Sequence, residues 1–324
     1  MIGTEAAVAQ TEGRKVAVQT KDLVRRFGDL VAVDHLNMTV YEGDLFGFIG
    51  SNGAGKTTTL RILATFLRPT EGTAEILGYD IQKEADTVRR LIGFMPDFFG
   101  VYRDMEVSEY LDFFGACYRI PAARREKMIN DVLELVGLSH KRGALIGALS
   151  RGMQQRLGLA RVLIHDPKVL LLDEPASGLD PRARIEVMAI LKELQRMGKT
   201  IIISSHILSE LQNLCNRVGI IEKGRLIYCG SMEEMHRELG LGHILWVRIR
   251  GNLDQAAQML RELDGVTQVQ VRDGALRVGV NPSQCDAARV AERLVQSGFG
   301  LLELRPEGTA LEEVFLRLTR GETQ

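Results

Sequence analysis

Hydrophobic and polar positions along this chain form a repeating pattern between residues 45 and 205. Apolar runs within 45–49, 169–172 and 200–204 are typical of strands buried on both faces of a parallel sheet. Apolar residues recur at three-to-four spacing in 59–67 and 185–196, which predicts helices there. Strands that alternate with helices indicate an α/β core with a parallel sheet.

Two other patterns adjoin this core. Short apolar segments at 16–18, 31–33 and 38–40 predict strands of an antiparallel β lobe, which precedes and accompanies the first βα unit. Residues 98–148 have the three-to-four spacing of helices, and we expect them to form a helical subdomain.

The last eighty residues have a different texture, in which strands and helices follow the order β-α-β-β-α-β. That order is the one of a ferredoxin-like α+β fold, so we expect a small accessory domain. A helix is expected to close the chain at 311–319. The segments are strands at 244–250, 266–271, 275–280 and 300–304, and helices at 253–263 and 285–296.

Length and charge narrow the class of protein. A chain of 324 residues with 45% hydrophobic content exceeds the usual size of one domain. We expect a disordered tail at 1–14, an α/β domain at 15–238 and an accessory domain at 243–324. With 41 basic and 42 acidic residues, the chain lacks the charge expected of a nucleic-acid-binding protein. It contains neither a signal-peptide pattern nor a run of about 18 apolar residues, which a membrane helix requires.

The segment after the run at 45–49 fits the P-loop pattern G-x-x-x-x-G-K-[ST]. A chance match is the alternative, but a buried strand before the motif and a helix after it supply its usual context. Lys56 is expected to reach the β- and γ-phosphates of a nucleotide, and the Thr57 hydroxyl to hold Mg²⁺. The nucleotide-binding candidates here are Gly50, Ser51, Asn52, Gly53, Ala54, Gly55, Lys56, Thr57 and Thr58.

Two adjacent carboxylates follow the apolar run at 169–172. An acid at the end of such a strand holds Mg²⁺ in P-loop NTPases, which makes Asp173 a metal ligand candidate. Glu174, beside it, is placed to orient and deprotonate a water in line with the γ-phosphate. A solvated acidic loop is the alternative interpretation.

Between these motifs lies the segment 149–156, Leu-Ser-Arg-Gly-Met-Gln-Gln-Arg, and here the chain resembles the nucleotide-binding subunits of ABC transporters. The family signature is LSGGQ, from which Arg151 and Met153 depart. Segments 176–181 and 202–206 resemble the family's D-loop and switch-histidine strand. The resemblance covers roughly residues 16 to 235.

The resemblance implies roles for residues that spacing alone leaves open. Phe27 would stack on adenine, although a lone Phe is as often a core residue. Ser150 and Gly152 would bind the γ-phosphate of ATP held by the opposite protomer, at a helix N-terminus. His206 would contact the γ-phosphate, although a histidine at a strand end is usually a satisfied polar group. Asp97 stands where the family has glutamine, and it is a candidate for contact with Mg²⁺ or its water.

The resemblance also implies partners. We expect an ATPase subunit, a homodimer or one paired with a homologous ATPase, that powers a separate membrane permease for export. It would be cytoplasmic and peripheral on the inner face of the cell membrane. Exposed members of the aromatic group Phe98, Phe99 and Tyr102 would help to dock the permease, unless all three form a small core. The alternatives are a soluble ABC-type ATPase not coupled to transport and a binding module without activity.

Overall fold

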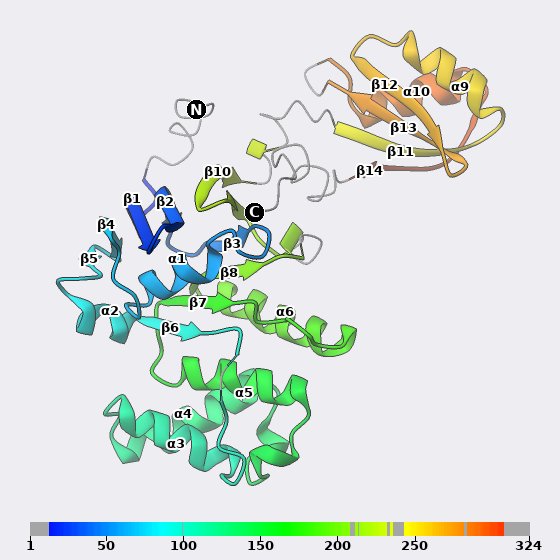
Figure 1. Cartoon of the computed structure of the whole chain (residues 1–324). Coiled ribbons are helices and arrows are strands. Elements are labelled where there is room, and N and C mark those ends of the chain that lie inside the picture. Colours follow the sequence, from blue (N-terminus) through cyan, green and yellow to red (C-terminus); the bar gives the residue numbers. More distant parts are fainter. Residues whose placement is uncertain are drawn as a thin grey trace. The chain divides into compact units, whose positions relative to one another are not determined.

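The computed structural model shows two compact units, with the division after Ser231 (Figure 1). None of the helices in the described part of the chain is both long and apolar enough to cross a lipid bilayer. The expected disordered tail at 1–14 lies almost wholly outside the described residues. These residues are 13–98, 100–207, 211–212, 214–231, 234–235, 243–281 and 284–307.

An antiparallel sheet with strand order β2-β1-β4-β5 opens the first unit. The segments 31–33 and 38–40, which were predicted as separate strands, both lie in the single strand β2. β2 pairs with β1 over its length, and the register shifts at several points. Such shifts are typical of bulges and interrupt the alternation of side chains, so the sequence pattern appears broken. The strands are β1 (Val16–Phe27), β2 (Leu30–Tyr41), β4 (Glu71–Ile76) and β5 (Tyr79–Asp80).

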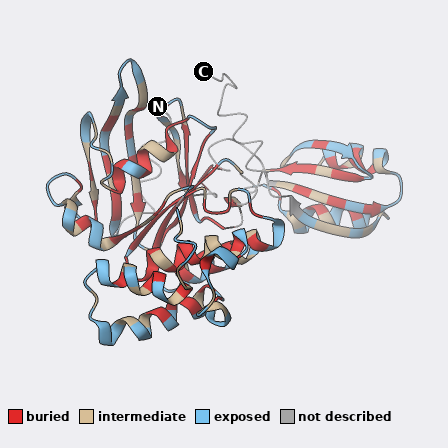
Figure 2. Ribbon diagram, turned by 60° about the horizontal axis from the view of Figure 1, so that its bottom comes forward, coloured by how far each residue is buried: buried red, intermediate tan, exposed pale blue. Residues whose placement is uncertain are grey.

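A six-stranded sheet with strand order β10-β9-β3-β8-β7-β6 forms the centre of the same unit. Five of its strands are parallel, and β10 is antiparallel to β9. Every residue of β3, β7 and β8 is buried, as the apolar runs predicted (Figure 2). The strands are β3 (Leu45–Ile49), β6 (Ile92–Met95), β7 (Val169–Asp173), β8 (Thr200–Ser205), β9 (Arg217–Glu222) and β10 (Arg225–Ser231).

Helices occupy the predicted regions, but two of them begin earlier than predicted. The helix expected at 59–67 begins at Lys56, directly after the glycine-rich turn, and ends at Leu63, shortly before Thr65 with its positive φ. The helix expected at 185–196 begins at Pro181, because the Asp180 side chain caps its N-terminus. The helices are α1 (Lys56–Leu63), α2 (Ala85–Leu91), α3 (Val107–Cys117), α4 (Ala122–Leu135), α5 (Arg151–Leu163) and α6 (Pro181–Arg196), with short 3₁₀ turns η1 (Ser139–Lys141) and η2 (Ile146–Ala148).

The second unit has the predicted element order β-α-β-β-α-β. Its four strands form one antiparallel sheet in the order β12-β13-β11-β14. Buried side chains of the sheet and both helices, among them Val247, Leu260 and Leu294, form a separate hydrophobic core. The closing helix predicted at 311–319 lies outside the described residues. The elements are β11 (His243–Arg250), α9 (Leu253–Arg261), β12 (Val266–Arg272), β13 (Ala275–Val280), α10 (Ala287–Gln296) and β14 (Gly300–Glu307).

Because each unit has its own core, we expect a chain that ends at Ser231 to fold. Circular dichroism of this fragment should show one cooperative thermal transition and retained helix content. A chain that ends at Glu222 is the control, because it lacks β10 and leaves the edge of β9 unpaired. The control should unfold at a lower temperature or aggregate. A fragment ending at Ser231 that is insoluble would show that the first unit depends on the second.

Candidate nucleotide site

The turn between β3 and α1 packs so tightly that two of its glycines leave no room for a side chain. A Cβ on Gly55 would lie 2.4 Å from the carbonyl oxygen of Ala32, and Gly55 has a φ of +106°. A Cβ on Gly50 would lie 2.5 Å from the carbonyl oxygen of Ile221. Both positions therefore require glycine. These contacts hold the loop against β2 and β9, at the N-terminus of α1, where backbone N–H groups favour an anion.

Lys56 is buried at the start of α1. Its Nζ donates hydrogen bonds to the carbonyl oxygens of Gly50, at 2.7 Å, and Ser51, at 3.1 Å. The same atom lies 3.7 Å from Oε1 of Glu174. Burial lowers the pKa of Lys56, and the negative charges of Glu174 and Asp173 oppose that shift. The lysine is therefore aligned along its own loop, with carboxylates as the charge that compensates it.

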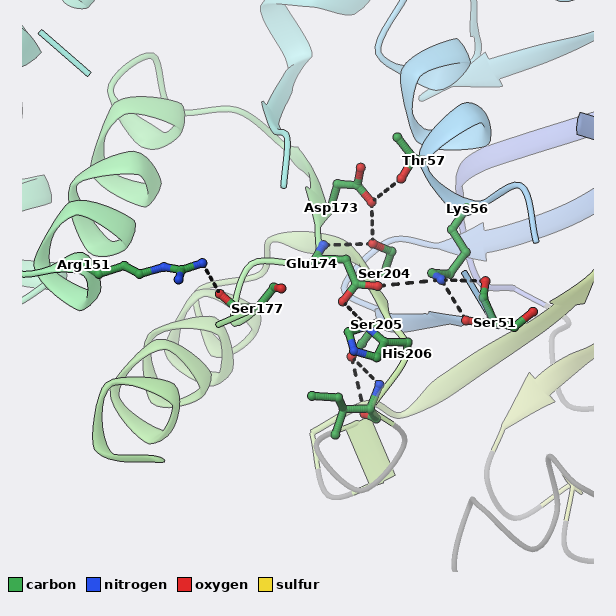
Figure 3. Close-up of polar contacts among 12 residues, drawn as sticks. Ser51, Lys56, Thr57, Arg151, Asp173, Glu174, Ser177, Ser204, Ser205 and His206 are labelled. Carbon is green, nitrogen blue, oxygen red and sulfur yellow. Dashed lines mark hydrogen bonds and ion pairs between the residues drawn. The ribbon is translucent and has the colours of Figure 1, made fainter. Parts of the chain in front are cut away.

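Asp173 joins three segments that are far apart in the sequence (Figure 3). Its Oδ1 accepts hydrogen bonds from Thr57 Oγ1, at 3.1 Å, and from Ser204 Oγ, at 2.7 Å. Ser204 Oγ in turn accepts a hydrogen bond from the backbone N–H of Glu174, at 2.9 Å. Asp173 and Ser204 are partners in the parallel pairing of β7 with β8. The sheet register therefore builds this network.

The carboxylate of Glu174 lies between two basic groups. Its Oε2 is 2.8 Å from His206 Nδ1, and its Oε1 faces Lys56. Glu174 has a φ of +50°, a left-handed conformation that costs free energy in a residue with a side chain. The interactions of its side chain and of its N–H hold it in that conformation. The direction of the carboxylate is thus fixed by contacts on both of its oxygens.

A pocket of about 430 Å³ opens beside these groups. Phe27, with 43% of its surface exposed, lies on the wall of this pocket, and the Arg25 guanidinium lies 4.5 Å from its ring centroid. Asp97, which follows β6, also lines the pocket. Residues expected to bind nucleotide or to react are thereby brought together. The lining residues are Phe27, Leu30, Ala32, Asn52, Gly53, Gly55, Lys56, Thr57, Thr58, Asp97, Glu174, Ser177 and His206.

Ser150 and Gly152 are not among the residues that line this pocket. Ser150 caps α5, and its Oγ accepts a hydrogen bond from the Met153 N–H at 3.3 Å. Gly152 is buried against α6, where a Cβ would lie 2.7 Å from the Cβ of Ala183. Within one chain, Ser150 and Gly152 therefore lie apart from the pocket that the P-loop residues line.

Sequence reasoning missed two polar residues of the site, besides Leu30 and Ala32 on the pocket wall. Ser204 is the hydroxyl that joins Asp173 to Glu174, and Ser177 lies on the pocket wall. The signal for Ser204 was its position at the end of a second buried strand, beside the predicted histidine. Ser177 lies in the segment that resembles the D-loop, but nothing in the sequence placed it near the pocket.

The two described members of the aromatic group after Asp97 are both exposed. Phe98 is 87% exposed, and Tyr102 is 55% exposed although its ring lies 6.2 Å from that of Tyr110 in the helical region. Phe99 lies outside the described residues. A larger aromatic surface lies elsewhere, in two adjoining hollows that share three rings, and Phe66 is the most exposed of these, at 71%. We call this surface the aromatic groove; its rings are Phe66, Phe94, Phe114 and Tyr118.

Replacing Ser204 with alanine should destabilise the first unit, because it removes one donor to a buried carboxylate and leaves the Glu174 N–H without its acceptor. We expect a loss of about 1–3 kcal/mol in the free energy of unfolding, measured with urea. Ser205→Ala is a matched control, because among the described residues the hydrogen bonds of that hydroxyl are to the backbone of Ile207. Equal urea midpoints for Ser204→Ala and wild type would contradict a stabilising bridge.

Comparison with known proteins agrees with this geometry. A profile described as ABC transporter matches residues 33–177. The bacitracin transport ATP-binding protein BcrA of Bacillus licheniformis is 36% identical over 315 residues, which cover 94% of this chain and 98% of that protein. The Nod factor export ATP-binding protein I of Burkholderia lata is also 36% identical, over 95% of this chain and 98% of that protein.

A solved structure of a dimeric ATP-binding cassette, in a post-hydrolysis state with ADP and Pi, matches with a TM-score of 0.59. The two sequences are 25% identical, and the match covers 66% of this chain and 98% of that one. The first unit thus has the fold of an ABC ATPase, and full-length relatives match across both units. The chain belongs to the ABC transporter family, as an ATPase subunit of the exporter type.

Proposed function

We propose that the pocket beside Lys56 and Glu174 binds ATP, and that hydrolysis there drives export through a separate membrane permease. One observation carries this proposal above the rest. The Glu174 carboxylate is held between His206 and Lys56, directly after an aspartate that bonds to the P-loop threonine. A nucleotide-binding loop, a metal-ligating acid and a base therefore meet at one edge of the sheet.

ATP would lie along the pocket from Phe27 to the start of α1. Phe27 would stack on adenine. The Arg25 guanidinium, which lies over the Phe27 ring, would add a further contact. The phosphates would lie in the loop of residues 50–58, where backbone N–H groups and Lys56 favour negative charge. A phosphate oxygen would replace the carbonyl groups that Lys56 now contacts.

The residues at the end of β7 fit a magnesium ion. A hydroxyl and a carboxylate are hard oxygen ligands, which Mg²⁺ prefers, and Thr57 and Asp173 already lie at hydrogen-bond distance. These two residues would hold the ion, and Asp97, which also lines the pocket, would contact the ion or its water. Bound there, Mg²⁺ would neutralise charge that develops on the phosphates.

Glu174 would act as the general base. Its carboxylate would orient a water toward the γ-phosphate and take up a proton from it as the new oxygen–phosphorus bond forms. The bond from the γ-phosphorus to the bridging oxygen would break at the same time, and ADP would leave with its electron pair. His206 holds the second carboxylate oxygen and would itself contact the γ-phosphate. Lys56 would stabilise the negative charge on the phosphate oxygens.

A second protomer would complete each site. Ser150 and Gly152, which lie apart from the pocket, would face the γ-phosphate of ATP bound to the partner, with the N-terminus of α5 favouring that anion. A two-fold arrangement of this kind is self-complementary, so a homodimer or a pair with a homologous ATPase satisfies it. The dimeric cassette that matches this fold supports the same proposal.

We assign residues 15–238 to the ATP-binding domain, with a helical subdomain at about 98–148, and residues 243–324 to an accessory domain. The sheet order of the second unit supports a ferredoxin-like fold for the accessory domain. Its proposed role is to stabilise the dimer or to regulate it. A packing module without a ligand is the alternative.

The aromatic groove is the proposed docking site for a short helix of the permease, which would hold this subunit at the cytoplasmic face of the membrane. The groove lies between the core and the helical region: Phe94 belongs to β6 of the central sheet, Phe66 to the segment after α1, and Phe114 to α3. Exposed apolar surface of this kind usually marks an interface. A soluble ABC-type ATPase that is not coupled to transport has no evident use for it.

The variant Glu174→Gln should retain ATP affinity and lose about 10²–10⁴ in kcat, because it removes the base and leaves the binding loop intact. Lys56→Ala should instead weaken nucleotide binding. Steady-state hydrolysis and equilibrium binding of a fluorescent ATP analogue separate the two effects. Glu193→Gln, which removes an exposed carboxylate on α6, is the control. Wild-type turnover by Glu174→Gln would refute the assignment of the base.

Phe66→Ser should reduce binding to the permease by about tenfold, because it removes an aromatic contact that the permease would bury. ATP hydrolysis by the isolated subunit should stay unchanged. Ile185→Ser is the matched control, because Ile185 lies on α6 away from the groove and is equally exposed, at 70%. The measurement is co-purification with the membrane protein after solubilisation in detergent. If both variants retain the permease equally well, the groove is not the docking site.

A further inference from the structure

Helix α5 is attached to the loop after Glu174 by two side chains. Arg151 Nη2 donates a hydrogen bond to the Ser177 carbonyl oxygen at 3.4 Å (Figure 3). Gln155 Nε2 donates one to the Pro175 carbonyl oxygen at 2.6 Å. The two donors are four residues apart, on one face of the helix. That face is therefore directed at the backbone of residues 174–178.

The position of Arg151 is unusual for a cation. It is the first residue of α5, where the helix dipole disfavours positive charge. A Cβ on Gly178 would lie 2.3 Å from Arg151 Nη2, and Gly178 has a φ of +65°. The guanidinium therefore packs on Gly178, whose left-handed backbone favours glycine. The Ser177 carbonyl oxygen accepts a hydrogen bond from this cation, which the helix end disfavours.

The loop that receives these bonds begins at the proposed base and reaches the wall of the pocket. Glu174 begins it, with a left-handed backbone, and Ser177 lies on the pocket wall. A displacement of either carbonyl would move the peptide units on which the direction of the Glu174 carboxylate depends. Ser150, the N-cap of α5, adjoins Arg151 at the same end of the helix.

We propose that Arg151 and Gln155 are positioning residues, which hold the loop of residues 174–178 on α5 and so align Glu174 for hydrolysis. The inference rests on the proposed function of Glu174 as base. It adds a path for coupling within one chain. When Ser150 engages the partner's ATP, the N-terminal end of α5 would shift. The two hydrogen bonds would then transmit this shift to the Glu174 carboxylate. Neither residue touches the nucleotide pocket itself.

The test is steady-state hydrolysis of Mg²⁺-ATP by the full chain carrying Arg151→Ala, Gln155→Ala or both. Each single change should lower kcat about tenfold, the effect of one charge-assisted or short hydrogen bond, and leave KM for ATP within about twofold. The double variant should lose less than the product of the two, because both bonds hold one loop. Cooperativity in ATP concentration should decrease in parallel.

Two conservative changes and one control sharpen the test. Arg151→Lys keeps a cationic donor and should recover part of the lost kcat, whereas Gln155→Glu places an acceptor against a carbonyl and should not. Arg182→Ala is the control, because Arg182 lies in the first turn of the neighbouring helix α6, is 91% exposed and pairs only with Glu186 in the described structure. It should match wild type in kcat.

Three outcomes would overturn the inference. These are an unchanged kcat in both alanine variants, a rise in KM without a fall in kcat, and a fall in kcat that a lower thermal midpoint fully explains. Glu174→Gln, assayed in parallel, distinguishes the two levels of the argument. If it turns over ATP as wild type does, the proposed base is wrong. If it is inactive while Arg151→Ala and Gln155→Ala match wild type, only the positioning role is wrong.

Discussion

The buried carboxylate of Asp173 is the group on which the arrangement of the site depends. Its surface is 1% exposed, and a charge in such a place is costly unless donors surround it. Thr57 and Ser204 supply those donors, one from the start of α1 and one from the end of β8. The ends of β7 and β8 and the start of α1 must therefore meet at the same edge of the sheet. Otherwise the Asp173 carboxylate would lack its hydrogen-bond donors.

Glu174 follows this anchor directly but is held in a different way. Its N–H is fixed by Ser204, and its side chain bridges to His206 and Lys56, whereas the chain after it turns away from the sheet. Glu174 is thus bonded to a buried strand through its N–H, and the loop after it is bonded to helix α5. Under the roles proposed above, the residues that would hold the metal stay in place while the direction of the Glu174 carboxylate depends on α5.

Much of this could be predicted from the sequence, because it is local. The run 45–49, the glycine-rich turn and the run ending at Asp173 each express their structure within a few residues. Ser204 could not be assigned a partner, since the pairing register of β7 and β8 is a property of the sheet. The aromatic groove escaped notice for the same reason: Phe66, Phe94 and Phe114 meet only after folding. Register shifts between β1 and β2 interrupt the alternation of side chains, so the sequence pattern predicted two strands where the structure has the single strand β2.

Gly224, in the turn between β9 and β10, connects the two sheets of the first unit through its backbone hydrogen bonds. The Gly224 N–H donates to the carbonyl of Ala54 in the nucleotide loop, at 3.0 Å, and the Gly224 carbonyl accepts from the Asp34 N–H of β2, at 2.9 Å. Gly224 thus contacts the loop and β2 from a turn that contributes no residue to the pocket lining. The nuclear magnetic resonance signal of its amide proton is therefore expected to shift whenever a ligand in the pocket moves the Ala54 carbonyl, without a label on the ligand.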